Sequence, residues 1–136
     1  MAHEHHVLML LTDAAAHRAD PAALERYTPR LAALAERDGH RLYAGIAERA
    51  YAVARRLDGD YAAAARHLDR ALDIFSALGT TWQLARTLVF RAELAQLQHD
   101  PAAARADYTQ ALAAFEALQA QPDLERTRQA LAEAAP

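Results

Sequence analysis

The chain has 136 residues, 53% of them apolar, which is enough for one domain with its own hydrophobic core. It contains no cysteine, so disulfides, thiolate metal sites and cysteine nucleophiles are excluded. The net charge of −3 and the lack of a basic, aromatic-rich stripe argue against nucleic-acid binding. No apolar run approaches the ~20 residues that span a bilayer, so we expect a cytoplasmic protein without membrane contact.

The residue usage favours helices. Gly and Pro are few, at 4 and 5 residues, while Ala and Leu are abundant, which indicates an all-α fold. The 15 positively charged side chains are all Arg because the sequence has no Lys, and Asn is missing as well. Both absences are typical of a GC-rich coding sequence, so we expect a bacterial protein.

The spacing of the apolar residues predicts the helices in chain order. The first, residues 4–18, is the most apolar, with an inward stripe that is widened by Met9 and Leu10 and consists of Val7, Leu8, Leu11 and Ala15. A second helix is predicted from Pro21 to Glu36, where Pro29 is expected to kink or split it near Thr28. Further helices are predicted at residues 41–57, 61–78, 82–98, 101–118 and 122–134. Trp82 is expected to pack against the end of the preceding helix.

The stretch of residues 58–79 recurs at residues 99–119, and a weaker copy covers residues 20–39. The matching pairs all have the same offset, and they are Asp60 and Asp100, Ala64 and Ala104, Ala71-Leu72 and Ala111-Leu112, Phe75 and Phe115, and Leu78 and Leu118. A period of this length is typical of stacked helical repeats. We therefore predict a single domain over residues 1–136, with repeats at about 4–38, 39–78 and 79–118 and a capping helix at about 122–134.

Each second helix carries the pattern of a known repeat. Gly59-Asp60-Tyr61, followed by Ala64, Leu68 and Ala71-Leu72, resembles the second half of a tetratricopeptide repeat (TPR). Ala52 and Ala92 match the small residue at the helix crossing in that family. The resemblance implies a TPR-like right-handed superhelix of three antiparallel helix pairs plus a C-terminal capping helix. The unit exceeds the usual ~34 residues and resembles the repeats of sensor regions in bacterial signalling and transcription-regulating proteins.

The resemblance also implies a function: a concave groove, lined by the first helix of each pair, that binds a protein or peptide without enzymatic activity or a cofactor. Matching the repeats places on this face Arg49, Val53 and Arg56 in the second pair, Arg86, Val89, Phe90, Glu93 and Gln96 in the third, and Met9, Asp13 and His17 in the first. Arginines beside apolar groups suit a partner with acidic and apolar side chains. Alternatively, the arginines pair with Glu48 or Glu93 and line an unoccupied groove.

Two other functions stay open. The apolar first helix, through Met9 and Leu10, could bind a second copy of the chain or be covered by an upstream domain. His3, His5 and His6 beside Glu4 could join copies through a metal ion, although such a terminus lacks the groups that orient ligands. No catalytic set is predicted, because the one serine, Ser76, has no His or Asp placed for it.

Overall fold

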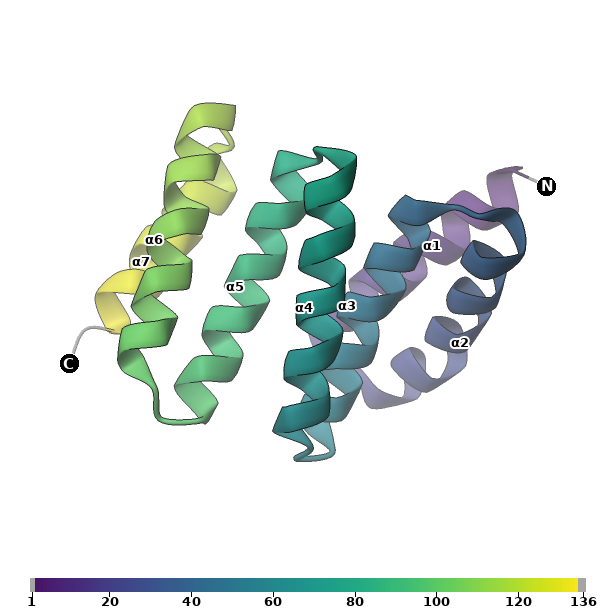
Figure 1. Cartoon of the computed structure of the whole chain (residues 1–136), viewed down its shortest axis with the longest axis horizontal. Helices are drawn as coiled ribbons and strands as arrows, with labels where there is room; N and C mark the ends of the chain where they lie inside the picture. The colour runs from purple at the N-terminus through teal and green to yellow at the C-terminus, as the bar shows by residue number, and fades with distance from the viewer. Residues whose placement is uncertain (1, 135–136) are drawn as a thin grey trace. The chain divides into compact units, whose positions relative to one another are not determined.

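The computed structural model describes the backbone of residues 2–134 and the side chains of residues 4–134. Over this range the chain forms seven α-helices joined by short turns (Figure 1), namely α1 (Ala2–Arg18), α2 (Pro21–Asp38), α3 (Arg41–Leu57), α4 (Tyr61–Leu78), α5 (Thr81–Leu97), α6 (Pro101–Leu118) and α7 (Gln121–Glu133). The helices pack as α1 with α2, α3 with α4 and α5 with α6, and α7 packs on α6. The prediction of an all-α fold with helix pairs and a capping helix is confirmed.

The helices group into two compact units. The N-terminal unit is Met1–Leu78 and holds α1 to α4, whereas the C-terminal unit is Gly79–Pro136 and holds α5 to α7. Their boundary falls between the second and third predicted repeats. It stays a prediction that both units form one domain and that the repeats make a right-handed superhelix. None of the helices within residues 2–134 is long and apolar enough to cross a membrane.

An aspartate begins the second helix of each pair. The carboxylates of Asp20, Asp60 and Asp100 each accept a hydrogen bond from the backbone N–H three residues further on, at 3.2, 3.0 and 3.1 Å. An N-cap of this kind contributes about 1 kcal/mol to helix stability. Proline follows Asp20 and Asp100 at the start of α2 and α6, where its missing N–H has no helical partner to lose.

The turns between the described helices share one backbone feature. Each contains a residue in the left-handed conformation, with φ between 52° and 81°, and these residues are Ala19, Gly59 and His99 after the first helices and Gly39, Gly79 and Gln119 after the second. Within each set the residues are evenly spaced, at the same interval as the three capping aspartates. Because only three of the six are glycine, the backbone keeps the repeat geometry even where the side chain disfavours it by about 1–2 kcal/mol.

Helix α2 contains a proline in its interior. Pro29 lacks the N–H that would bond to the carbonyl one turn earlier, yet α2 runs without interruption from Pro21 to Asp38. Leu24, Thr28 and Leu31 all stay on its buried face. The split predicted near Thr28 does not occur, because burial of this face outweighs one missing hydrogen bond, and the alternative of a kink stays a prediction.

Helices α3 and α4 of the N-terminal unit approach closely where Gly45 meets Phe75. A Cβ atom at Gly45 would lie 2.5 Å from Cε1 of the Phe75 ring, well inside the roughly 3.5–4.0 Å of an ordinary carbon contact. The predicted small residues Ala52, Ala64 and Ala71 are all buried in this unit. Small side chains therefore set the spacing of the pair.

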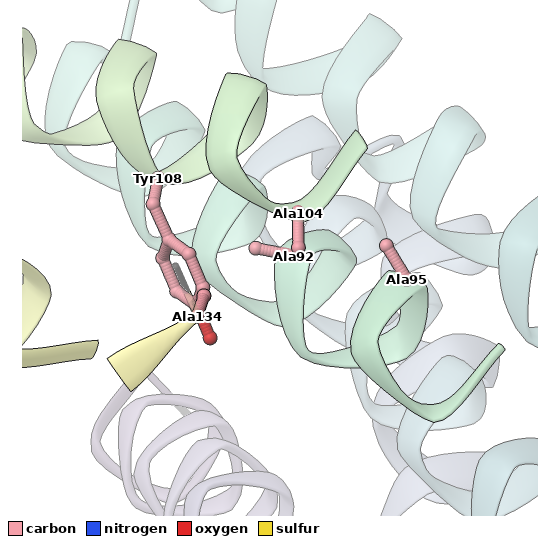
Figure 2. Close-up of a cluster of buried hydrophobic side chains, with 5 residues drawn as sticks. All are labelled: Ala92, Ala95, Ala104, Tyr108 and Ala134. Carbon is pink, nitrogen blue, oxygen red and sulfur yellow. The ribbon is translucent and has the colours of Figure 1, made fainter. Parts of the chain in front are cut away.

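The C-terminal unit has a core of small residues around one tyrosine (Figure 2). Ala92 and Ala95 of α5, Ala104 and Tyr108 of α6, and Ala134 after α7 form one buried cluster. Figure 2 shows the Tyr108 ring directed from α6 towards Ala134. Ala134, with Ala130 and Leu131 of α7 packed against the cluster, thus covers the core of this unit, as expected of a capping element.

Candidate functional site

The predicted partner-contact residues lie on α1 and α3 of the N-terminal unit and on α5 of the C-terminal unit. Arg49, Val53 and Arg56 belong to α3 of the N-terminal unit. Arg86, Val89, Phe90, Glu93 and Gln96 belong to α5 of the C-terminal unit. The two sets have different environments.

Arg49 lies in the core of the N-terminal unit. Its side chain is 0% exposed, and its Nη2 donates a hydrogen bond to Oδ1 of Asp13 on α1 at 2.8 Å. Its guanidinium also lies 5.3 Å from the centre of the Phe75 ring on α4. Arg49 therefore joins three helices of its own unit. The prediction that it contacts a partner is corrected, because a fully buried side chain is not available at the surface.

Most of the other predicted residues of α3 and α1 are also partly or wholly buried. Val53 is only 2% exposed, so its prediction as a contact residue is corrected in the same way. Arg56, Met9 and Asp13 are half-buried, whereas His17 is exposed. The predicted face of the N-terminal unit thus serves mainly to hold α1 and α3 together.

Helix α1 buries a different stripe from the predicted one. Thr12, Ala15 and Ala16 are buried, and of these only Ala15 belongs to the stripe predicted from the periodicity. Val7 and Leu11, which the periodicity placed inward, are 52% and 40% exposed, and Leu10 is 51% exposed. The inward assignment of Val7 and Leu11 is wrong because α1 is apolar on nearly every side, so its periodicity does not identify one face.

In the C-terminal unit, the face of α5 carries a tryptophan held on two sides. The Trp82 ring is 43% exposed, and the guanidinium of Arg86 lies 4.7 Å from its centre. Arg86 also donates to Oε1 of Gln83 at 3.2 Å. The indole Nε1 of Trp82 donates to Oδ2 of Asp123 on α7 at 3.0 Å, and Oδ1 of Asp123 accepts from Arg126 at 2.7 Å.

Trp82 was missed as a site residue, and its packing against the preceding helix end stays a prediction. Its polar partner is Asp123, which follows it by 41 positions. The signal that could have found it is helical spacing, because Trp82 precedes Arg86 by four positions and Phe90 by eight. These three side chains share one side of α5, and we call them the α5 face.

The predicted residues further along α5 are tied to Tyr108. The Tyr108 hydroxyl donates to Oε1 of Gln96 at 2.8 Å, and Val89 packs against the core cluster around Tyr108. Burial raises the pKa of Tyr108 to about 12, and the nearby carboxylates of Glu93 and Glu133 act in the same direction. Val89 therefore supports the α5 face from within the unit, whereas Gln96 is exposed and accepts the Tyr108 hydrogen bond at the surface.

A pocket of about 430 Å³ lies between α2 and α3 of the N-terminal unit. Its walls include several alanines, and its polar groups include Glu48 and Tyr51. Glu48 Oε2 lies 2.6 Å from Nδ1 of His67, whose ring stacks on Tyr51 with centres 5.4 Å apart. A volume of this size falls in the range of ligand-binding pockets, about 300–1,000 Å³. No sequence motif predicted it, because its lining combines residues of two helices and of the turn between them.

The histidines near the N-terminus do not gather into a metal site among the described residues. His5 Nδ1 lies 3.9 Å from Oδ2 of Asp38. Within residues 4–134 no three His, Cys, Asp or Glu side chains are placed to hold a metal ion. The side chain of His3, which the metal-linked alternative also invokes, lies outside the described residues.

The sequence of the chain was compared with protein families, curated proteins and solved structures, and one family model matches the region of the helix pairs. Neither the curated proteins nor the solved structures contain a significant match to the chain. Residues 42–117, more than half of the chain, match the sequence model of the tetratricopeptide repeat. This range runs from α3 into the last turn of α6 and so covers the two clearest copies of the repeat. The chain therefore belongs to the tetratricopeptide repeat family, whose repeats point to a protein-interaction module.

Proposed function

We propose that the chain is a non-enzymatic module that binds an extended segment of a partner protein on the α5 face. The observation that carries the proposal is the exposed Trp82 ring, fixed by the hydrogen bond to Asp123 and by Arg86. Tryptophan and arginine are among the residues most enriched where binding energy concentrates. A side chain that is already held in place loses little conformational entropy when a partner binds.

The charges around Trp82 favour an acidic segment. Arg86 and Arg126 flank the ring and its hydrogen-bond acceptor, while Asp123 supplies one negative charge between them. The two guanidiniums place positive charge beside the ring and its acceptor. A partner segment with a carboxylate next to an aliphatic or aromatic side chain matches this charge and the rings of Trp82 and Phe90.

The biological setting follows from the resemblance of the repeats. Units longer than the usual ~34 residues resemble those of bacterial sensor regions, so we place the module in a cytoplasmic bacterial regulatory or signalling system. The partner is then a protein of that system. This placement rests on the repeat length and on the residue usage, and the α5 face does not depend on it.

Selection from a random peptide display library on the immobilised chain tests the α5 face. We expect enriched peptides to combine Asp or Glu with an apolar neighbour. Trp82→Ala should weaken their binding by about 2 kcal/mol, roughly thirtyfold. Trp82→Phe keeps a ring beside Arg86 but loses the hydrogen bond to Asp123, so it should keep an intermediate affinity, and circular dichroism of both variants separates loss of contact from loss of folding.

Charge reversal supplies the matched control. Arg86→Glu should shift the enriched peptides from acidic to basic at one position. Arg105→Glu makes the same change on an exposed position of α6 in the same unit and should leave the selection unchanged. Enrichment without acidic residues, or an equal response to both reversals, would show that the α5 face is not the binding surface.

A further inference from the structure

Helix α1 has two apolar faces, only one of which is covered. Its buried face, with Thr12, Ala15 and Ala16, packs on α2 and α3. On the other side Val7, Leu10 and Leu11 are each at least 40% exposed. A helix that is apolar all round is usually buried on all sides, so this second face is suited to an additional contact.

The open face has the spacing of a coiled-coil seam. Glu4, Val7, Leu11, Ala14 and Arg18 follow one another at intervals of three and four positions, with Leu10 beside Leu11. All are exposed except Ala14, which is half-buried. The seam begins with an acidic residue in the first turn of α1 and ends with basic residues in the last turn.

We infer that this seam binds the same seam of a second copy of the chain, with the two α1 helices antiparallel about a two-fold axis near Leu10 and Leu11. This arrangement places Leu10 against Leu11 and Val7 against the small Ala14 of the other copy. It also brings each Glu4 to the end of the partner helix that carries Arg18. A parallel arrangement would set like charges against each other at both ends.

The contribution of charge is limited by the chain itself. Arg30 of α2 lines the same hollow as Glu4, so the Glu4 carboxylate already has a cation of its own copy nearby. The apolar contacts of Val7, Leu10 and Leu11 therefore supply most of the affinity, and the terminal charges select the direction. Three exposed apolar side chains per copy make a small interface, so the dimer should be reversible and concentration-dependent.

The inference is tested by sedimentation equilibrium of the full chain across a concentration series. We expect a monomer–dimer equilibrium. Leu10→Glu should raise the dissociation constant by about a hundredfold, because each dimer then loses two apolar contacts. Leu118→Glu, at a similarly exposed leucine of α6, is the matched control and should change nothing. Circular dichroism of each variant confirms that the helices are retained.

Charge exchange and crosslinking test the direction of the helices. Glu4→Arg and Arg18→Glu should each weaken the dimer severalfold, and the double variant should recover it. Since the chain has no cysteine, a mixture of Glu4→Cys and Arg18→Cys chains should form mixed disulfides rather than symmetric ones.

Three results would overturn the inference: a monomer at every concentration, symmetric disulfides, or equal effects of Leu10→Glu and Leu118→Glu. A monomer at every concentration would be expected if another protein or a further segment of the polypeptide covers this face. The inference does not rest on the proposed peptide binding. Leu10→Glu should leave peptide selection on the α5 face intact, so either idea can fail without the other.

Discussion

The pairs α3–α4 and α5–α6 have the same backbone plan but hold their helices together by different chemistry. In α3–α4, the rings of Tyr51 and His67 stack. At the equivalent positions of the next repeat, Arg91 and Asp107 form two hydrogen bonds, each of 2.9 Å. The comparison teaches that a repeat position specifies where two helices meet, while the side chains that meet there can be aromatic or charged.

The same contrast extends to three further pairs of equivalent positions. The buried Arg49 corresponds to the half-buried Val89, and Gly45 under the Phe75 ring corresponds to Ala85. Leu68 corresponds to Tyr108. Each pair can be tested by substituting one member and making the equivalent change in the other unit. The two changes in the free energy of unfolding show how much each repeat depends on that position.

The largest loss of stability is expected from Arg49→Ala. The substitution leaves Asp13 without its partner at 2.8 Å and removes the guanidinium beside Phe75. Removal of one member of a buried ion pair costs about 3–5 kcal/mol, measured as the free energy of unfolding in urea. Val89→Ala should cost only about 1 kcal/mol.

A double variant separates charge from packing at this position. Arg49→Met with Asp13→Leu should recover much of the lost stability, because an apolar pair can replace a buried ion pair. A loss below about 1 kcal/mol for Arg49→Ala would show that the Arg49–Asp13 link contributes little.

Gly45→Ala should cause the second-largest loss of stability. The new Cβ would lie 2.5 Å from the Phe75 ring, so the pair must move apart at a cost of about 1–3 kcal/mol. The better helix propensity of alanine offsets up to about 1 kcal/mol of this. Ala85→Gly is the reverse change in α5 and should cost about 1 kcal/mol through propensity, in addition to the loss of one buried methyl group.

A change in the size of the Phe75 side chain, which packs on Gly45, tests this close approach. In the Gly45→Ala background, Phe75→Leu should cost less than it does in the wild type, because the smaller side chain relieves the clash. A Gly45→Ala variant that is more stable than the wild type would contradict the close approach of α3 and α4.

His99→Gly is expected to change stability less, and to increase it. His99 has φ of 59° in the turn where the equivalent residue is Gly59, with φ of 81°. Glycine removes the cost of the left-handed conformation, although it also gains freedom in the unfolded chain. The net gain should be about 1 kcal/mol, seen as a higher melting temperature, and Gly59→Ala should lower it by a similar amount.

The sequence predicts the helices of this fold well because their ends depend on local chemistry. Asp20 and Asp100 mark helix starts through hydrogen bonds to backbone groups in the next turn. The constant repeat interval then transfers each assignment from a clear copy to a weaker one. His99 shows the strength of this transfer, since it adopts the conformation of Gly59 without being glycine.

The candidate site is predicted less well because it depends on pairs that are distant in sequence. Whether Arg49 is a surface residue is decided by Asp13, which precedes it by 36 positions. The orientation of Trp82 is likewise decided by Asp123 on α7. Helical periodicity places a side chain on a face of its own helix but does not say which other helix covers that face.

The last contrast, between Leu68 and Tyr108, concerns ionisation and appears only in alkali. Burial raises the pKa of Tyr108 to about 12, above the ordinary value of about 10 that applies in the unfolded chain. The folded state therefore keeps the proton when the unfolded state has lost it. The contribution to stability is fully present below about pH 10 and is lost as the pH rises from about 10 to about 12.

Tyr108→Phe isolates this contribution. The variant loses the hydrogen bond to Gln96 and should be about 1 kcal/mol less stable at neutral pH. It should also lose less stability than the wild type between about pH 10 and about pH 12, because one proton fewer is released on unfolding. Urea unfolding at a series of alkaline pH values, with phenolate absorbance as a second signal, measures both effects. Identical pH profiles for the two proteins would mean that Tyr108 ionises in the folded unit as readily as in the unfolded chain.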